Sequence, residues 1–439
     1  MKKLITTIKN IFKIEELRKR IFYTLALVLI YRLGSFIVLP GIDATAISGS
    51  KLAAQGQDGL IGLLNMFSGG AFSNASIFAL GIMPYISASI VIQLLGIMVP
   101  YFQRLQREGE SGRRKMNQYT RYLTILILLF QGPAYIVNLH LQLPPDAFLV
   151  SGVWFNTTST IILLAGTMFV MWLGERITDR GIGNGISLII MIGIIARLPF
   201  ALVAEVGTRF TQNQGGILMF IVEMVVLFFI FVACIALVQG VRKIPVQYAR
   251  RIVGNKQYGG QRQYIPLKIN AAGVMPIIFA QALMMIPLLF TGFAGSTALN
   301  NQYGFWYNFI FGLLVMIFTY FYTAVTVNPT NMAEDMKKNG GFIPGVKPGK
   351  RTAEYLDNVM SRITLPGSFF LAIVAILPTF AAIVFGIDRN GFAQFYGGTS
   401  LLILVGVVLD TLQQIESHLL MRHYDGLMKT GKLKGRSGM

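Results

Sequence analysis

A few ionisable side chains stand inside the long apolar runs of this chain, where a charge is costly. They are Arg32, Glu223, Asp410 and Glu416. Buried acids of this kind often carry ions or protons through membrane transporters. No basic residue besides Arg32 is evident at a depth that matches one of the acids. Two interpretations therefore stay open: the acids couple a solute to an ion, or they are satisfied contacts between helices.

Signatures of catalysis are absent from the sequence. It contains neither the HExxH pattern of zinc proteases nor the GxSxG pattern of serine hydrolases, and GVKPGKR lacks the spacing and the final Ser or Thr of a nucleotide-binding loop. The single cysteine, Cys234, excludes a disulfide within the chain and a thiolate cluster, and the three histidines are too scattered for a metal site. We therefore expect no enzyme activity, no metal and no cofactor.

The composition is that of a polytopic helical membrane protein. Of the 439 residues, 54% are hydrophobic and only 13% are charged, which excludes a soluble enzyme. A helix that crosses the hydrocarbon core needs about 20 apolar residues. Runs of about this length predict ten spans, at residues 21–39, 74–97, 119–138, 154–173, 184–200, 216–238, 271–292, 308–327, 366–386 and 399–419.

Basic residues gather on one side of these spans. The formal net charge is +19, and 33 of the 38 Lys and Arg residues lie in or beside the two terminal segments and every second loop. By the positive-inside rule, these loops and both termini are cytoplasmic. Because ten spans divide into two halves of five, the second half starts from the opposite face, which is the topology of an inverted repeat. We expect an N-terminal half at 1–200 and a C-terminal half at 201–439.

An apolar stretch too short to cross a bilayer precedes the second span, on the predicted outer side. Leu60 to Phe67 is followed by Ser68, Gly69 and Gly70, which favour helix poorly. Irregular backbone at membrane depth is tolerated only where protein or water satisfies it. The short piece therefore either lies at the membrane interface or folds back into a cavity as a stopper.

Two cytoplasmic loops are longer than a connection requires. Residues 239–270 and 328–366 combine turn-forming Gly and Pro with positive charge, and apolar and polar residues alternate from Arg242 to Val253 as in a strand. Ordered basic loops suit a large anionic partner such as RNA, or a motor protein. Topological anchoring alone would explain their charge but not their length.

Several long motifs resemble one known family. The chain contains, in order, NMFSGGAFSNASIFALGIMPYISASIVIQLL, EGESGRRKMNQYTRY, MWLGERITDRGIGNGISLII, PLKINAAGVMPIIFAQ, NPTNMAEDMKKNGGFIPGVKPG and FYGGTSLLILVGVVLD. With them it closely resembles the SecY family over nearly its whole length. The resemblance implies an all-α fold of ten transmembrane helices in two pseudo-symmetric inverted halves around an hourglass pore. It also implies a channel in the bacterial cytoplasmic membrane that conducts unfolded polypeptides and releases apolar segments into the lipid.

The same resemblance implies roles for individual residues. A pore ring would be formed by Ile82, Ile86, Ile186, Ile190, Ile278 and Ile403. A plug at about residues 60–70 would include Leu60, Ile61, Leu63, Leu64, Asn65, Met66 and Phe67. A lateral gate, between spans two and three on one side and seven and eight on the other, would involve Ser87, Ile90, Gln93, Gln131, Met275, Phe279 and Gln281.

The partners that the resemblance implies are macromolecules and lipids. They are the SecE and SecG subunits, the SecA motor ATPase, the ribosome, signal sequences, nascent or presecretory polypeptides and membrane lipids. SecA or the ribosome would dock at Arg242, Arg250, Arg251 and Lys347. Lys347 stands where the bacterial family usually has arginine, so the charge is kept but the planar fork is lost.

The alternative function comes from another class of membrane protein. It is an ion-coupled secondary transporter of a small solute, and it is supported by the inverted five-plus-five count and by Glu223 and Asp410.

Overall fold

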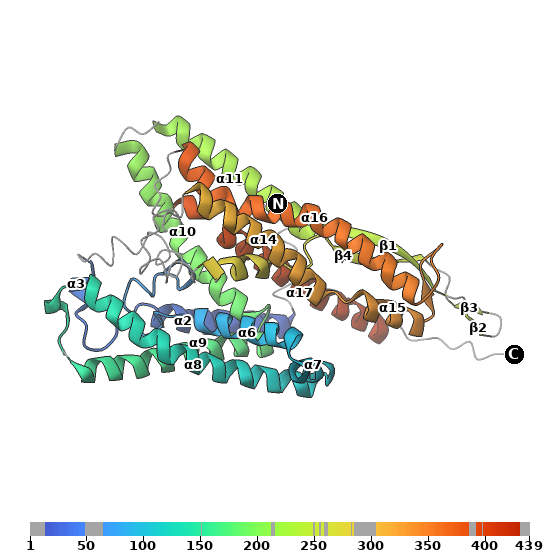
Figure 1. The fold of residues 1–439 in the computed structure, drawn as a ribbon, viewed down its shortest axis with the longest axis horizontal. Coiled ribbons are helices and arrows are strands. Elements are labelled where there is room, and N and C mark those ends of the chain that lie inside the picture. The colour runs from blue at the N-terminus through green and yellow to red at the C-terminus, as the bar shows by residue number, and fades with distance from the viewer. Residues whose placement is uncertain are drawn as a thin grey trace. The chain divides into compact units, whose positions relative to one another are not determined.

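The structure is a computed structural model that describes residues 14–48, 65–150, 152–211, 216–248, 251–253, 256–258, 262–281, 283–284, 304–385, 392–396 and 398–430. The chain groups into two compact units, Met1–Pro199 with Val407–Met439 and Phe200–Gly406. Helices make up most of both units (Figure 1).

The first unit is helical in its described part. Its elements are α2 (Glu15–Gly34), α3 (Ala44–Ser48), α6 (Met83–Met98), α7 (Pro100–Arg107), α8 (Glu110–Gln142), η1 (Pro145–Ala147), α9 (Val153–Arg180), the first part of α10 (Gly185–Thr211) and the later part of α17 (Gly398–Thr430). Helix α8 packs against α6 and α9, and Figure 1 shows α8 and α9 side by side. One core of this unit joins Phe72 and Ala75 to Tyr135 of α8 and to Phe155 and Leu163 of α9.

The second unit combines long helices with short strands. Its elements are the end of α10, α11 (Gly216–Gln239), β1 (Val241–Tyr248), β2 (Arg251–Val253), β3 (Lys256–Tyr258), β4 (Arg262–Lys268), α14 (Phe305–Thr326), α15 (Pro329–Lys338), β5 (Gly341–Phe342), α16 (Lys350–Phe385), η2 (Phe392–Tyr396) and the start of α17. Residues 275–281 are also helical. Helix α14 packs along α16.

The described helices fit a membrane protein with many spans. Seven of them are long and apolar enough to cross a membrane, and the bent pair of α6 and α7, with 100° between its helices, would make eight. The remaining two expected spans correspond to α2 and to residues 271–292, of which 282 and 285–292 lie outside the described residues.

The start of the second span differs from the sequence-based expectation. A helix was predicted from residue 74, but α6 begins only at Met83, and residues 68–82 form hydrogen-bonded turns. Serine and asparagine side chains here bond to nearby backbone groups, which competes with helix formation. Gly69, Gly70 and Gly81 also have positive φ angles of 66°, 94° and 55°, which a regular helix excludes.

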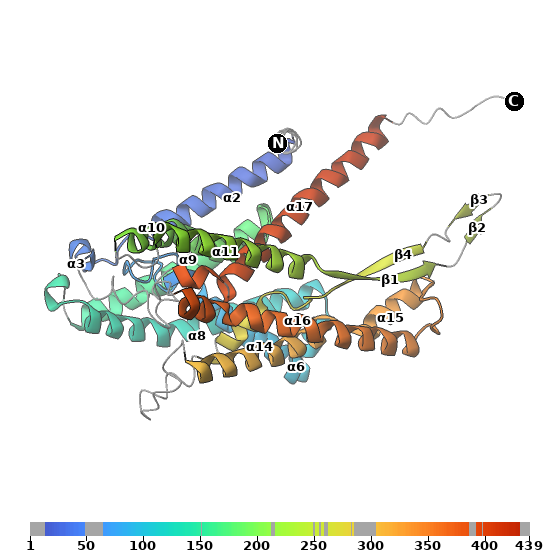
Figure 2. The ribbon, with the colours of Figure 1, turned by 90° about the horizontal axis from the view of Figure 1, so that it is seen from above.

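The two long basic loops, residues 239–270 and 328–366, fold together into one small sheet with its own core. Strand β1 pairs antiparallel with β4 and, at its end, with β5, in the order β4-β1-β5. Figure 2 shows β1 and β4 as a ribbon, with β2 and β3 beyond its tip. The alternation predicted for Arg242 to Val253 is seen in β1 from Lys243 to Val246, where Ile244 and Val246 are buried and Lys243 and Pro245 are exposed. Together with α15 and α16, this sheet encloses a core of Ile244, Val246, Leu267, Met336, Ile343, Leu356 and Met360.

Candidate functional site

Asn65 organises a tight turn before the second span. Its backbone carbonyl accepts a hydrogen bond from the Gly70 N–H at 2.9 Å, and its side-chain oxygen accepts from the N–H and the hydroxyl of Ser73 at 3.1 and 2.9 Å. The Ser68 hydroxyl donates to the Asn65 carbonyl at 3.2 Å and accepts from the Phe72 N–H at 3.1 Å. The turn therefore satisfies much of its own backbone.

Two buried tyrosines attach this turn to helices of the first unit. The Tyr31 hydroxyl of α2 donates to the Ser68 carbonyl at 3.2 Å, and the Tyr135 hydroxyl of α8 donates to the Phe72 carbonyl at 2.7 Å. The rings of Tyr135 and Phe72 also meet edge to face, with centroids 4.7 Å apart. Side chains from two helices thus satisfy carbonyl groups of this buried, non-helical backbone.

The structure describes only the end of the predicted plug. Asn65, Met66 and Phe67 are buried, and they form a short helical turn. The other plug candidates, Leu60, Ile61, Leu63 and Leu64, lie outside the described residues.

The pore-ring candidates are distributed over both units. The first unit contains Ile82, Ile86, Ile186 and Ile190, and the second contains Ile278 and Ile403. Ile82 directly precedes α6, and the Ile86 N–H donates to its carbonyl at 3.1 Å, so the two lie one turn apart. Ile186 lies against Gly174 of α9, where an added methyl group would come within 3.1 Å of the isoleucine side chain. Ile82, Ile86, Ile190 and Ile403 are buried.

The lateral-gate candidates occupy three helical segments. Ser87, Ile90 and Gln93 lie on α6, where the Gln93 amide donates to the Ser89 hydroxyl at 3.3 Å. Gln131 is exposed on α8. The candidates in the second unit are Met275, Phe279 and Gln281, all in the helical segment 275–281.

Phe279 connects this segment to α14. Its ring stacks on Phe318 with centroids 5.6 Å apart, and Tyr322 lies 6.0 Å away. The seventh and eighth predicted spans are therefore neighbours within the second unit.

Two of the four docking candidates have described side chains. Arg242 is exposed on β1, and Lys347 is exposed in the turn between β5 and α16. A side chain of α16 holds that turn, because the Thr352 hydroxyl donates to the Lys347 backbone carbonyl at 2.9 Å. Arg251 begins β2, and Arg250 lies outside the described residues.

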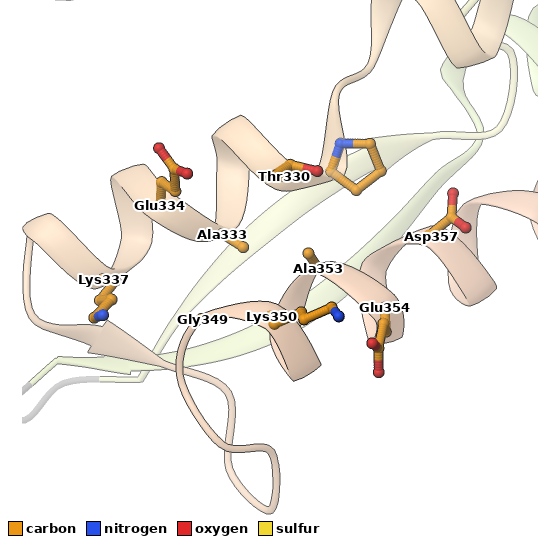
Figure 3. A pocket seen from close by; sticks show the side chains of 10 residues that line it. Thr330, Ala333, Glu334, Lys337, Gly349, Lys350, Ala353, Glu354 and Asp357 are labelled. Atoms are coloured by element: carbon orange, nitrogen blue, oxygen red, sulfur yellow. The ribbon is translucent and has the colours of Figure 1, made fainter.

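A groove that the sequence did not indicate lies close to Lys347. It has a volume of about 630 Å³ and runs between α15 and the start of α16. Ala333 and Ala353 point toward one another between the helices (Figure 3). Its lining includes the charged residues Glu334, Lys337, Lys350, Glu354 and Asp357. Because the two alanine side chains are small, the helices leave space between them. This space forms a groove with charged lining residues, next to the turn that contains Lys347.

A buried ion network in the second unit was also missed. The Arg209 guanidinium pairs with Glu205, one helical turn earlier, at 2.9 Å and with Glu223 of α11 at 2.5 Å. All three side chains are at most 4% exposed. The expectation that no basic residue besides Arg32 matches the acids is therefore wrong. Arg209 fell beyond the predicted end of the fifth span at residue 200, whereas α10 continues to Thr211. Asp410 and Glu416 are exposed on α17.

The chain is similar to known proteins along most of its length. The family model described as SecY matches residues 76–412. The protein translocase subunit SecY of Streptomyces galbus is 43% identical, with 97% of this chain and 100% of the relative covered. The corresponding subunit of Thermotoga maritima is 41% identical, with 98% and 99% covered.

Solved structures share the fold. A SecY structure, in which the plug domain is described as stabilising the closed state and maintaining a membrane seal, has a TM-score of 0.60 at 18% identity and covers 94% of both chains. Sec61 in the canine ribosome-channel complex has a TM-score of 0.57 at 16% identity, again with 94% of both chains covered. The family model spans most of the chain and the bacterial relatives nearly all of it, so the chain belongs to the SecY family.

Proposed function

We propose that this chain forms the conduit of a protein translocase, through which unfolded polypeptides cross the cytoplasmic membrane and from which apolar segments pass into the lipid. Membership of the SecY family and a multi-pass helical fold support this activity. The observation that carries the mechanism is the buried, internally bonded turn at residues 65–76, a few residues before α6. Such a turn at the end of a short apolar piece is what a folded-back stopper requires.

Six isoleucines form the collar of the conduit. They are Ile82, Ile86, Ile186, Ile190, Ile278 and Ile403. Branched aliphatic side chains offer no polar group to water or ions, so a narrow ring of them closes by dewetting. The same side chains change rotamer to fit around a passing polypeptide. The one-turn spacing of Ile82 and Ile86 and their burial support the assignment.

A plug and a lateral gate complete the conduit. Residues of about 60–70 cover the collar in the resting state, as the plug domain does in the related SecY structure. The gate lies between the α6 and α8 side, with Ser87, Ile90, Gln93 and Gln131, and the segment of Met275, Phe279 and Gln281 with α14. An apolar segment that passes through it gains roughly 25 cal/mol per Å² of apolar area removed from water.

Docking takes place on the folded cytoplasmic loops. Arg242, Arg250, Arg251 and Lys347 contact the SecA motor or the ribosome, and a ribosome-channel complex of related fold supports the second partner. SecE and SecG are the companion subunits.

The chain itself supplies no catalysis, so the partners provide the energy for translocation. Both termini face the cytoplasm, and the halves 1–200 and 201–439 flank the pore.

Deletion of residues 60–70 tests the plug and the pore together. The complex that contains this chain is reconstituted into lipid vesicles with and without the deletion, and resting ion conductance is measured. We expect the deletion to create conductance and to leave SecA-driven uptake of a presecretory protein in place. An ion-tight deletion would contradict the plug, and absence of uptake by the intact complex with SecA and ATP would contradict the channel itself.

A further inference from the structure

Arg32 contacts the turn that ends the proposed plug. Its guanidinium Nη1 donates a hydrogen bond to the Gly69 carbonyl at 3.0 Å, and its carbon lies 5.2 Å from the centre of the Phe36 ring. An arginine inside an apolar run is costly unless it meets polar partners, and is for that reason a candidate functional residue. Here the partner is a backbone carbonyl of a non-helical turn.

Gly69 is confined on two sides at this contact. Its φ of +66° belongs to the region that glycine adopts readily. A methyl group at Gly69 would lie 2.7 Å from Nη1 of Arg32 and 2.9 Å from the Cα of Gly193 on α10. A methyl group at Gly193 would in turn lie 2.7 Å from the Phe67 carbonyl oxygen. The turn is therefore clamped between α2 and α10, within one compact unit.

Tyr31 provides a second bond beside the first. Its hydroxyl donates to the Ser68 carbonyl at 3.2 Å, and its ring, 1% exposed, stacks on Phe78 with centroids 6.2 Å apart. Consecutive residues of α2 thus donate to consecutive carbonyls of the turn. Two adjacent bonds fix the orientation of the turn as well as its position.

We propose that Arg32 is the positioning residue of the plug: with Tyr31 it binds the turn at Ser68 and Gly69 and holds the plug in its closed position. The inference rests on the proposed function, because it requires residues of about 60–70 to act as a plug. Displacement of the plug breaks the bond to Gly69 and leaves the guanidinium without that partner in an apolar setting. Hydrogen bonds to charged groups are stronger than neutral ones, so Arg32 contributes more than Tyr31 to keeping the channel closed.

Conductance of reconstituted complexes tests the proposal. Arg32→Met removes the donor but keeps an apolar stem, and we expect resting ion conductance to rise about tenfold, to no more than that of the 60–70 deletion. Tyr31→Phe, the matched loss of a neutral donor, gives a smaller rise. Arg32→Met combined with the deletion leaks no more than the deletion alone, because both act through the plug.

A chemical readout of plug position keeps the test independent of conductance. Met66 is 3% exposed and Cys234 is the single native cysteine. In a chain with Cys234→Ser and Met66→Cys, a membrane-impermeant maleimide should label the M66C thiol about tenfold faster when Arg32→Met is added.

The outcomes separate the two proposals. If the deletion leaks while Arg32→Met stays ion-tight and its M66C thiol stays protected, the role of Arg32 is overturned and the plug stands. If Arg32→Met adds to the leak of the deletion, Arg32 acts elsewhere and the proposal is also overturned. A deletion that does not leak overturns the plug assignment and this inference with it.

Discussion

Arg209 lies buried between two carboxylates, and its replacement should destabilise the second unit more than replacement of either acid. Without the guanidinium, Glu205 and Glu223 would face each other as like charges in a desolvated setting. Breaking a buried ion pair in this way costs about 3 kcal/mol or more. Glu223→Gln leaves the pair of Arg209 and Glu205 intact, so its cost should be about 1 kcal/mol or less. Both costs are measured by thermal unfolding of the purified complex, with chemical modification of the buried Cys234 thiol as the signal of unfolding.

An exposed arginine provides the control for this comparison. Arg242→Met on β1 removes the same charge from an exposed position and should leave the unfolding temperature almost unchanged. Equal losses of unfolding free energy in Glu223→Gln and Arg209→Met would contradict the prediction. They would show that Arg209 does not stabilise the unit by separating the two negative charges.

At the scale of elements, the turn between β5 and α16 should tolerate charge reversal without unfolding. Lys347 is exposed, and the turn is held instead by backbone bonds, including the Thr352 N–H to the Gly349 carbonyl at 3.0 Å. We predict that Lys347→Glu lowers motor-driven or ribosome-coupled translocation about tenfold, because a like charge replaces a complementary one at the docking surface. Lys338→Glu, at an exposed position on α15, is the matched reversal. Normal translocation and normal SecA binding by Lys347→Glu would remove Lys347 from the docking surface.

At the scale of the whole molecule, a channel and an ion-coupled transporter differ in their need for acids. Replacing Glu223 and Asp410 by their amides would abolish ion-coupled solute uptake. A polypeptide channel should keep at least about half of its translocation activity, because the exposed Asp410 and the ion-paired Glu223 have no part in a dewetted collar. Polypeptide translocation by the double variant decides between the channel and the transporter. Loss of translocation, with an unchanged unfolding temperature, would contradict the channel and favour the transporter.

Amino-acid types alone determined the membrane class and most helices, because apolar length and the placement of charge are local properties of the chain. The alternation that predicted β1 is equally local. The motifs carried the family resemblance, and the matches to SecY relatives confirmed it.

Only the tertiary structure decided which polar groups meet. The sequence shows Arg32 only as a costly charge inside an apolar run. Its partner, the Gly69 carbonyl, lies on a turn 37 residues further along the chain. Arg209 fell outside the predicted spans, so its pairing with Glu223 could not be anticipated. The turns before Met83 replaced a predicted helix partly for a similar reason. Asn65 and Ser68 bond to groups a few residues away, but the bonds of Tyr31 and Tyr135 join this turn to helices far away in the chain. Hydropathy counts residues one at a time, whereas a buried polar group is stable only when a particular partner reaches it.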